Sequence, residues 1–273
     1  MKALGSFEYL QSAYGAKQSA MVLEICVDSV ESAMGSDRGG ADRVELCSAL
    51  REGGITPSVG LISGARRAIS IDLFVLIRPR GGDFVYTDHE FKVMEEDIRA
   101  ARKGGAQGVV LGLLTMAGHV DVERTRSLID LARPLEVTFH RAFDVSIDLD
   151  RALEDVIACG ADRLLTSGGE PNAIRGTERI VALRESAGDR IRVMAGAGIR
   201  ETNVRTLVER TGIDEIHTSL RAGSSVHNAQ ARHAGAHVKI GSAEDEFARF
   251  VVVEESVRRF RSTLQDIHTE ADR

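Results

Sequence analysis

The stretch Gly39-Gly-Ala-Asp-Arg-Val-Glu-Leu-Cys47 decides the fold, because its pattern returns three times along the chain. The segment that begins at Gly40 leads into a short apolar run, and so do the segments that begin at Gly105, Gly160 and Gly212. Each of these glycines follows a helical stretch, at the position where a left-handed residue commonly ends a helix. Four equivalent helix-to-strand turns, one at every second unit, predict a barrel built by duplication.

Eight short apolar runs alternate with longer amphipathic stretches, which is typical of a parallel sheet with crossover helices. The chain has 273 residues, enough for one large barrel or two small domains. Eight units favour a single closed TIM-type (β/α)8 barrel, with an open doubly-wound sheet as the alternative. The runs are Val22–Val27, Val44–Cys47, Leu73–Ile77, Gly108–Leu111, Glu136–Phe139, Arg163–Thr166, Ile191–Ala195 and Glu215–Thr218.

We expect the barrel, with a C-terminal helix, to occupy residues 21–273. Residues 1–20 are a mixed segment without an apolar core or arginines, which fits neither a secretory signal nor an organelle transit peptide. We expect this segment to be a poorly ordered extension.

Side chains alternate along a strand, so the aligned glycines also predict which residues face the barrel interior. Val44, Leu46, Leu164 and Ile216 are expected to face the helices. Because buried charges must be paired, we interpret the lower inward residues as an ion network of Glu24, Glu45, Glu215, Arg43 and Arg163. Directed inward above or beside them are Cys26, Cys47, Arg78, His140 and His217.

Composition excludes several classes of protein. The net charge is −6 and the pI is about 5.8, and no basic stripe of the kind that nucleic-acid binding needs is visible. No run reaches the roughly 18–20 apolar residues that span a bilayer. Three cysteines do not make a disulfide framework, so a reducing, cytoplasmic compartment is expected.

The pattern Glu-x-Cys occurs on two neighbouring strands, at Glu24–Cys26 and at Glu45–Cys47. Thiolates are soft ligands for copper(I), zinc or iron–sulfur clusters, and parallel strands about 4.8 Å apart bring two inward thiols within reach of one ion. Zinc usually takes four ligands, whereas copper(I) accepts fewer. The alternative is that both cysteines are ordinary small core residues. Arg78 nearby would favour thiolate and the glutamates would oppose it, a balance that the sequence leaves open.

Two arginines occupy the loop Ile77-Arg-Pro-Arg-Gly-Gly-Asp-Phe-Val-Tyr86. Arg78 leaves the third strand at its carboxyl end, and Arg80 follows a rigid proline. Their forked donors suit a carboxylate or a phosphate. The alternative is that they neutralise Asp83 and the inward glutamates.

The run Thr138-Phe-His-Arg-Ala-Phe-Asp144 ends the fifth strand, where barrels place catalytic residues. His140 is therefore a candidate acid, base or ligand, and Arg141 and Asp144 are a candidate pair. The turn Ser167-Gly168 follows the sixth strand and would expose backbone N–H groups to an anion. We predict that this turn binds an anion together with Arg78. The alternative is that it is only a tight turn without a ligand.

Together these segments resemble the copper homeostasis protein CutC family, over roughly Leu23 to Arg221. The most specific parts, in order, are residues 24–32, 39–47, 77–84 and 137–144. The resemblance implies a cytoplasmic TIM-type barrel that forms homodimers or homotetramers and binds copper(I) through Cys26 and Cys47. One departure is Met194-Ala-Gly-Ala-Gly198, where members of the family often have more glycine and a proline.

Two hypotheses of different classes follow, with the copper ion or a small anionic metabolite as the ligand. The first is a copper(I)-binding homeostasis protein that uses thiolates, and the second is an enzyme acting on a phosphorylated or carboxylated metabolite at the same mouth. In the second, Glu45 or His140 is the acid or base. The anion binders would be Arg78, Arg80, Ser167 and Gly168, supported by Glu24, Arg141, Asp144 and His217.

The polar region 222–241 is expected to be a mobile loop that contains His227, His233 and His237. The last two are four residues apart, a spacing that binds metal on a helix. Gly235 between them disfavours a rigid helix and therefore this site.

Overall fold

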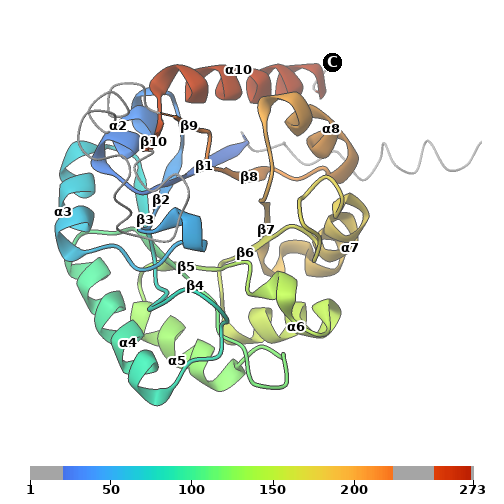
Figure 1. Cartoon of the computed structure of the whole chain (residues 1–273). Coiled ribbons are helices and arrows are strands. Elements are labelled where there is room, and N and C mark those ends of the chain that lie inside the picture. The colour runs from blue at the N-terminus through green and yellow to red at the C-terminus, as the bar shows by residue number, and fades with distance from the viewer. Residues whose placement is uncertain (1–20, 224–248, 272–273) are drawn as a thin grey trace, which may run out of the picture.

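The computed structural model describes residues 21–223 and 249–271. Eight parallel strands close into a barrel in the order β1 to β8, and helices surround it (Figure 1). The closed barrel confirms the TIM-type fold and excludes the open sheet. The strands are β1 (Val22–Val27), β2 (Arg43–Leu46), β3 (Asp72–Leu76), β4 (Gly108–Leu111), β5 (Glu136–Phe139), β6 (Arg163–Thr166), β7 (Arg192–Ala195) and β8 (Glu215–Thr218).

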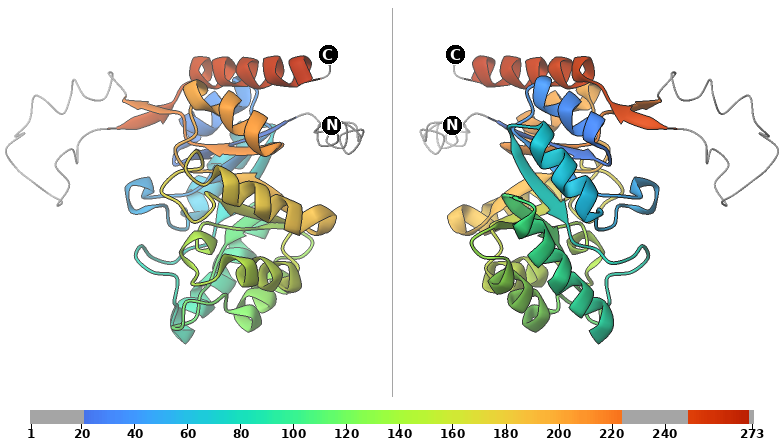
Figure 2. Two further views of the ribbon diagram at one scale, coloured as in Figure 1. Left: turned by 90° about the vertical axis from the view of Figure 1, so that its right-hand side faces the viewer. Right: turned by 90° about the vertical axis from the view of Figure 1, so that its left-hand side faces the viewer.

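Eight helices are found among the described residues, and they form the outer layer. They are α2 (Val30–Arg38), α3 (Val59–Ala68), α4 (Asp88–Lys103), α5 (Val122–Ala132), α6 (Leu149–Cys159), α7 (Thr177–Ala187), α8 (Glu201–Thr211) and α10 (Glu254–Ala271). The last helix, α10, lies over α2 and α8 and completes the ring between them (Figure 2). Before it, β9 (Arg221–Gly223) pairs with β10 (Phe250–Val252) in a small antiparallel sheet. None of the described helices is both long and apolar enough to cross a membrane.

The four glycine turns that predicted the fold have the expected backbone. Gly40, Gly105, Gly160 and Gly212 have φ angles of +88°, +84°, +85° and +61°. Only glycine adopts this region without strain, so the repeated glycine is a requirement of the turn that carries the chain from a helix back into the barrel.

The predicted register is confirmed by two separate apolar clusters. Val44, Leu46, Leu164 and Ile216 belong to the large cluster between the strands and the helices. A second cluster contains Cys26, Cys47, Phe74, Leu76 and Val110 and fills the interior of the barrel. Alternate strand residues therefore face opposite sides, as the sequence pattern predicts.

A buried ion network crosses the lower interior. Arg43 donates to Glu24 on one side and, at 3.1 Å, to Glu215 on the other. Arg163 also pairs with Glu215 and lies 3.3 Å from Glu136. The predicted network therefore exists with one correction: Glu45 lies near His217, at 3.5 Å, and Glu136 joins the arginines instead.

Phe74 fills the space between the two arginines of this network. The guanidinium carbons of Arg43 and Arg163 lie 4.7 and 5.5 Å from the centre of its ring, which adds cation–π attraction. Gly108 makes room for the ring, because a Cβ atom there would lie 2.5 Å from it. Gly108 therefore leaves the space that the ring of Phe74 occupies in this layer.

We expect Arg163→Met to lower the free energy of unfolding by about 3–5 kcal/mol, because it leaves the buried Glu215 with one fewer partner. The matched control is Arg190→Met, which removes an ion pair with Glu154 whose side chains are about half exposed. Exposed pairs contribute little, so this variant should unfold near the wild-type midpoint. Urea unfolding followed by circular dichroism measures both, and equal effects would contradict the role of the network.

Candidate functional site

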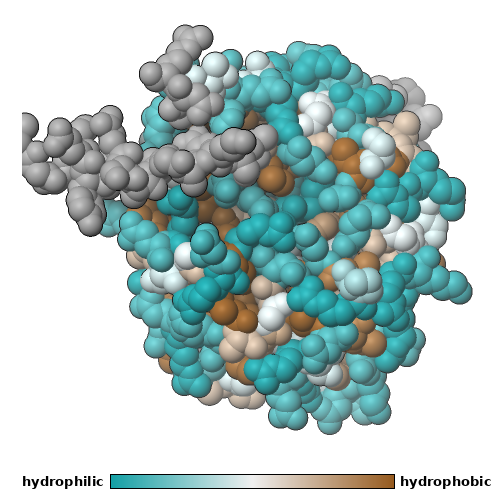
Figure 3. Space-filling view, turned by 180° about the vertical axis from the view of Figure 1, so that it is seen from behind, coloured by the Kyte–Doolittle hydropathy of each residue, from teal (hydrophilic) through white to brown (hydrophobic). Residues whose placement is uncertain are grey.

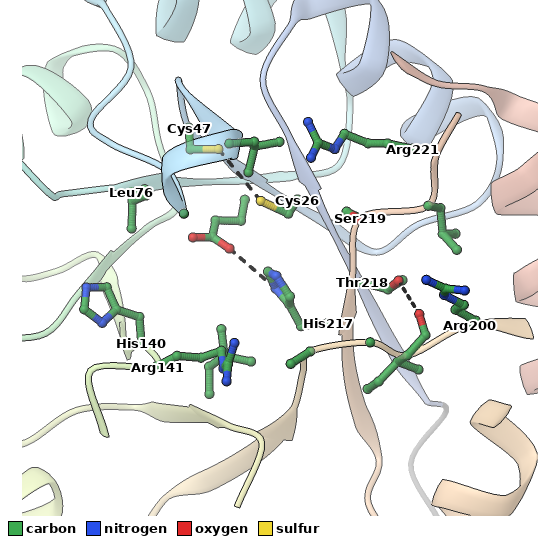
Figure 4. Close-up of a pocket in the computed structure, with 18 of the residues that line it drawn as sticks. Cys26, Cys47, Leu76, His140, Arg141, Arg200, His217, Thr218, Ser219 and Arg221 are labelled. Atoms are coloured by element: carbon green, nitrogen blue, oxygen red, sulfur yellow. Dashed lines mark hydrogen bonds and ion pairs between the residues drawn. The ribbon is translucent and has the colours of Figure 1, made fainter. Parts of the chain in front are cut away.

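A cavity of about 810 Å³ opens at the carboxyl ends of the strands. Residues of β1, β2 and β8 line its inner part, and the loops that follow several strands line its mouth (Figure 4). Seven of the predicted site residues line this cavity: Cys26, Glu45, Cys47, Arg78, His140, Arg141 and His217. The other five, Glu24, Arg80, Asp144, Ser167 and Gly168, do not line it.

The two predicted thiols lie side by side. Cys26 is on β1, Cys47 directly follows β2, and their Sγ atoms are 3.8 Å apart (Figure 4). Both are buried and free of any disulfide. The predicted proximity is confirmed, and it arises because the residues face inward from adjacent strands that pair Cys26 with Glu45 and Val27 with Leu46. Cys159 lies elsewhere, buried against the carbonyl of Val122.

His217 of β8 lies beside the thiols and between two carboxylates. Its Nδ1 atom is 2.7 Å from Oε1 of Glu24 and 3.5 Å from Oε2 of Glu45. Burial would lower the pKa of His217, but its hydrogen bonds with Cys26 and Glu24 and the charges of both glutamates outweigh burial and hold this pKa well above its ordinary value. The imidazole therefore carries a positive charge near neutral pH.

The two glutamates respond to the same environment in opposite ways. Burial would raise the pKa of Glu24, but the charge of Arg43 and the hydrogen bond with His217 hold it well below its ordinary value. At Glu45 burial dominates and, with the repulsion of Glu24, raises the pKa to about 7 despite the attraction of His217. Glu24 is thus a fixed charge, whereas Glu45 exchanges a proton near neutral pH.

The hydrogen bonds, burial and charges around the two thiols together favour the protonated form of Cys26. The hydrogen bond with Cys47 and burial raise the pKa of the Cys26 thiol well above its ordinary value, and the charges of Cys47 and Glu45 raise it further. The ligand atoms of Cys26, Glu45 and His217 all lie within 4.8 Å of one another. One metal ion placed between them would be in reach of sulfur, oxygen and nitrogen donors.

The opposite wall of the cavity contains His140, which follows β5 and is buried. Its Nδ1 atom accepts a hydrogen bond of 3.1 Å from the backbone N–H of Ala142. The ring proton is therefore on Nε2, a buried atom that has no hydrogen-bond partner. Burial, and then the charge of Arg78, lower the pKa of His140 to about 3, so the ring is neutral.

Arg78 stands next to His140, across the ring of Phe84. Its guanidinium carbon lies 4.9 Å from the centre of that ring, and the ring centres of Phe84 and His140 are 5.0 Å apart. The guanidinium donates to the carbonyl oxygens of Glu52, Gly54 and Gly82 at 3.0, 2.8 and 2.7 Å. Arg78 thus ties together the loops after β2 and β3.

Arg80 points away from the cavity. It pairs with Glu90 at 2.6 Å and with Asp83 at 3.0 Å, and so holds its own loop against the start of α4. The alternative reading of Arg80, that it neutralises Asp83, is the one that the structure favours.

The turn at Ser167 does not meet Arg78, because it already holds a carboxylate of the protein. Asp144 accepts hydrogen bonds from the N–H groups of Ser167 at 3.0 Å and Gly169 at 3.1 Å. Gly168 donates instead to the hydroxyl of Thr166. The predicted pair of Arg141 and Asp144 is confirmed at 2.7 Å. The expected convergence of this turn with Arg78 on one anion is therefore wrong.

Sequence reasoning missed three arginines of the cavity lining: Arg259 of α10 and, at the mouth, Arg200 and Arg221 (Figure 4). Arg200 is exposed and precedes α8, and Arg221 lies 3.6 Å from Asp28. Both come shortly after a strand ends, a position that carries function in barrels, so their place in the chain was a usable signal. The predicted loop histidines His227, His233 and His237 lie outside the described residues, as does the extension 1–20.

Fold and cavity together define a (β/α)8 barrel protein whose thiols and ionisable side chains collect where barrels bind their ligands. The model of the CutC family matches residues 21–222. The chain therefore belongs to the CutC family.

Individual relatives agree with this assignment. The chain is 50% identical to the human copper homeostasis protein cutC homolog over 204 residues. This match covers 75% of each protein. It is 47% identical over 243 residues to a CutC family protein of Chromobacterium violaceum, which covers 89% of this chain and 98% of the relative. The solved structure of CutC from Streptococcus agalactiae is 36% identical, with a TM-score of 0.69 over 72% of this chain and 97% of that one.

Acid should destabilise the protein partly through His140. This residue is neutral in the folded state down to a pKa of about 3, whereas in the unfolded chain it takes up a proton below about pH 6.5. The unfolded state then binds more protons, so stability is full above pH 6.5 and falls by up to about 1.4 kcal/mol per pH unit as the pH drops from there towards 3.

His140→Gln should remove this component, because its amide can still accept from Ala142 but does not titrate. The measurement is the free energy of urea unfolding of both proteins at several pH values between 5 and 8. Parallel curves for wild type and variant across this range would show that His140 is not the group responsible.

Proposed function

We propose that the protein binds copper(I) in copper homeostasis and that the thiolates of Cys26 and Cys47 are its ligands. The observation that carries the proposal is the separation of 3.8 Å between two inward Sγ atoms that are not joined in a disulfide. The names of the relatives, which refer to copper homeostasis, support the choice of metal.

The donors fit this ion. Soft sulfur ligands favour copper(I) over harder cations. Two metal–sulfur bonds of about 2.3 Å put their sulfurs about 4.6 Å apart when the bonds are collinear, and closer when a third ligand bends them, so the thiols need to move apart by less than about 1 Å. His217 adds a nitrogen donor at the same point once its imidazole loses the proton that it carries near neutral pH, whereas the carboxylate of Glu45 is a harder ligand. When bound, copper(I) would supply charge that holds both sulfurs as thiolates.

The thiols also favour a location. Two sulfurs this close form a disulfide readily in an oxidising compartment, and cytosolic thiols are kept reduced. We therefore infer that the protein acts in the cytoplasm, where copper(I) is also the stable oxidation state of a thiolate-bound ion. The homodimer or homotetramer that the family resemblance implies stays a prediction.

Substitution of either inner cysteine should weaken copper(I) binding. Loss of an outer-shell partner costs a metal site 10–100-fold in affinity, so loss of a ligand in Cys26→Ser or Cys47→Ser should cost more than about tenfold. The measurement is an anaerobic titration of the metal-free protein with copper(I) against a competing chromophoric chelator.

Cys159→Ser is the matched control, because this thiol is buried too but lies away from the cavity. Its affinity should equal that of wild type. Equal binding by all four proteins would show that copper is not held by these thiols, and an enzyme that acts on a small anionic metabolite, with Glu45 or His140 as acid or base, would then be the better hypothesis.

A further inference from the structure

Arg78 is a buried cation without a carboxylate partner. Only 5% of this residue is exposed, and its guanidinium contacts three backbone carbonyl oxygens. Within the described part of the chain no carboxylate lies at salt-bridge distance from it; Asp83, whose pKa its charge helps to lower, pairs with Arg80 and is exposed. A buried charge that lacks a counter-ion is costly, so this arrangement is suited to an anion from outside.

Two unpartnered donors accompany that charge. Nε of Arg78 and Nε2 of His140 are both buried and without a hydrogen-bond partner. Both residues line the cavity, and Phe84 packs against each of them. Buried donors are almost always satisfied by protein, water or ligand, and here two donors and one positive charge lie on the same wall.

The cavity is much larger than a metal ion requires. Its volume of about 810 Å³ lies within the range of pockets that bind organic molecules. Five arginines line it; three of them pair with carboxylates of the protein, and the charges of Arg78 and Arg200 are left to favour a negative ligand. Arg200 at the mouth is exposed, and the described residues provide no partner for its side chain. Apolar side chains complete the wall between mouth and interior: Leu50, Leu76, Phe84, Val145, Leu165 and Ile199.

From this geometry we propose that the cavity binds a small organic anion, whose phosphate or carboxylate head group lies against Arg78 and His140. The body of the ligand contacts the apolar wall, and Arg200 and Arg141 attract it at the mouth. This site uses none of the atoms of the two thiols, so it is independent of the copper(I) proposal and goes beyond it.

The test is isothermal titration calorimetry of the reduced, metal-free full chain with four probes. Glycerol 3-phosphate carries only a phosphate, glycerate only a carboxylate, inorganic phosphate has no organic body, and glycerol has no charge. We expect at least one of the two charged organic probes to bind more than about tenfold more tightly than inorganic phosphate, while glycerol does not bind. The better of the two identifies the head group.

Variants locate the binding. Arg78→Gln should lower the affinity for the better probe more than about tenfold, because a charge-assisted pair is lost. Because Arg78 also ties two loops together, its loss could act through the fold, so substitutions of His140 provide a second test. His140→Phe removes the donor and should weaken binding of the probe several-fold. His140→Gln keeps a donor and should bind the probe as wild type does. Arg210→Gln removes the same charge from α8 outside the cavity and should bind as wild type does.

The double variant Cys26→Ser/Cys47→Ser separates the two proposals. It should lose copper(I) and keep the affinity of wild type for the anion. The anion proposal is overturned if no charged probe binds at concentrations up to about 10 mM, well above ordinary substrate affinities. It is overturned equally if His140→Phe and Arg78→Gln, when folded, bind with the dissociation constant of wild type.

Discussion

The pairing of Arg43 with Glu24 and Glu215 is the interaction on which the barrel depends. The three residues come from β2, β1 and β8, so one guanidinium joins the first and last strands to their neighbour at the point where the sheet closes. A charge that is buried here demands a partner, and Arg163 from β6 meets the same Glu215. The network therefore joins strands from opposite sides of the barrel and leaves little choice of register.

The same network determines the charge of the cavity above it. Glu24 is held ionised by Arg43 and in turn contacts His217, so it keeps a positive imidazolium beside the thiols on one side of the cavity. On the other side lie Arg78 and His140, which hold a buried positive charge and two buried donor atoms without a hydrogen-bond partner. The two proposed ligands are therefore assigned to different walls of the cavity, the soft cation to the thiols and the anion to Arg78 and His140.

Residues whose positions depend on the local sequence pattern could be predicted, and residues whose positions depend on tertiary contacts could not. The repeated glycine turns and the eight alternating units sufficed to predict the barrel. The alternation of side chains along its short strands then sufficed to predict the register and the meeting of Cys26 and Cys47. The loops were not predictable in this way, because their partners are chosen by tertiary contacts. Asp144 accepts a hydrogen bond from the turn at Ser167, and Glu90 of the next helix pairs with Arg80. Neither contact is indicated by a periodic pattern in the sequence.

The electrostatics of the thiols argue for cation binding rather than for nucleophilic chemistry. A reactive cysteine needs a positive environment that lowers its pKa, but the pKa of Cys26 is raised by Cys47, by burial and by Glu45. The charge of Arg78 is directed towards backbone carbonyl oxygens instead. Negative charge that opposes a bare thiolate attracts a metal cation, and the cation then compensates the thiolates that it binds. Glu45, which helps to make Cys26 a poor nucleophile, therefore favours a positive ion beside the pair of thiols.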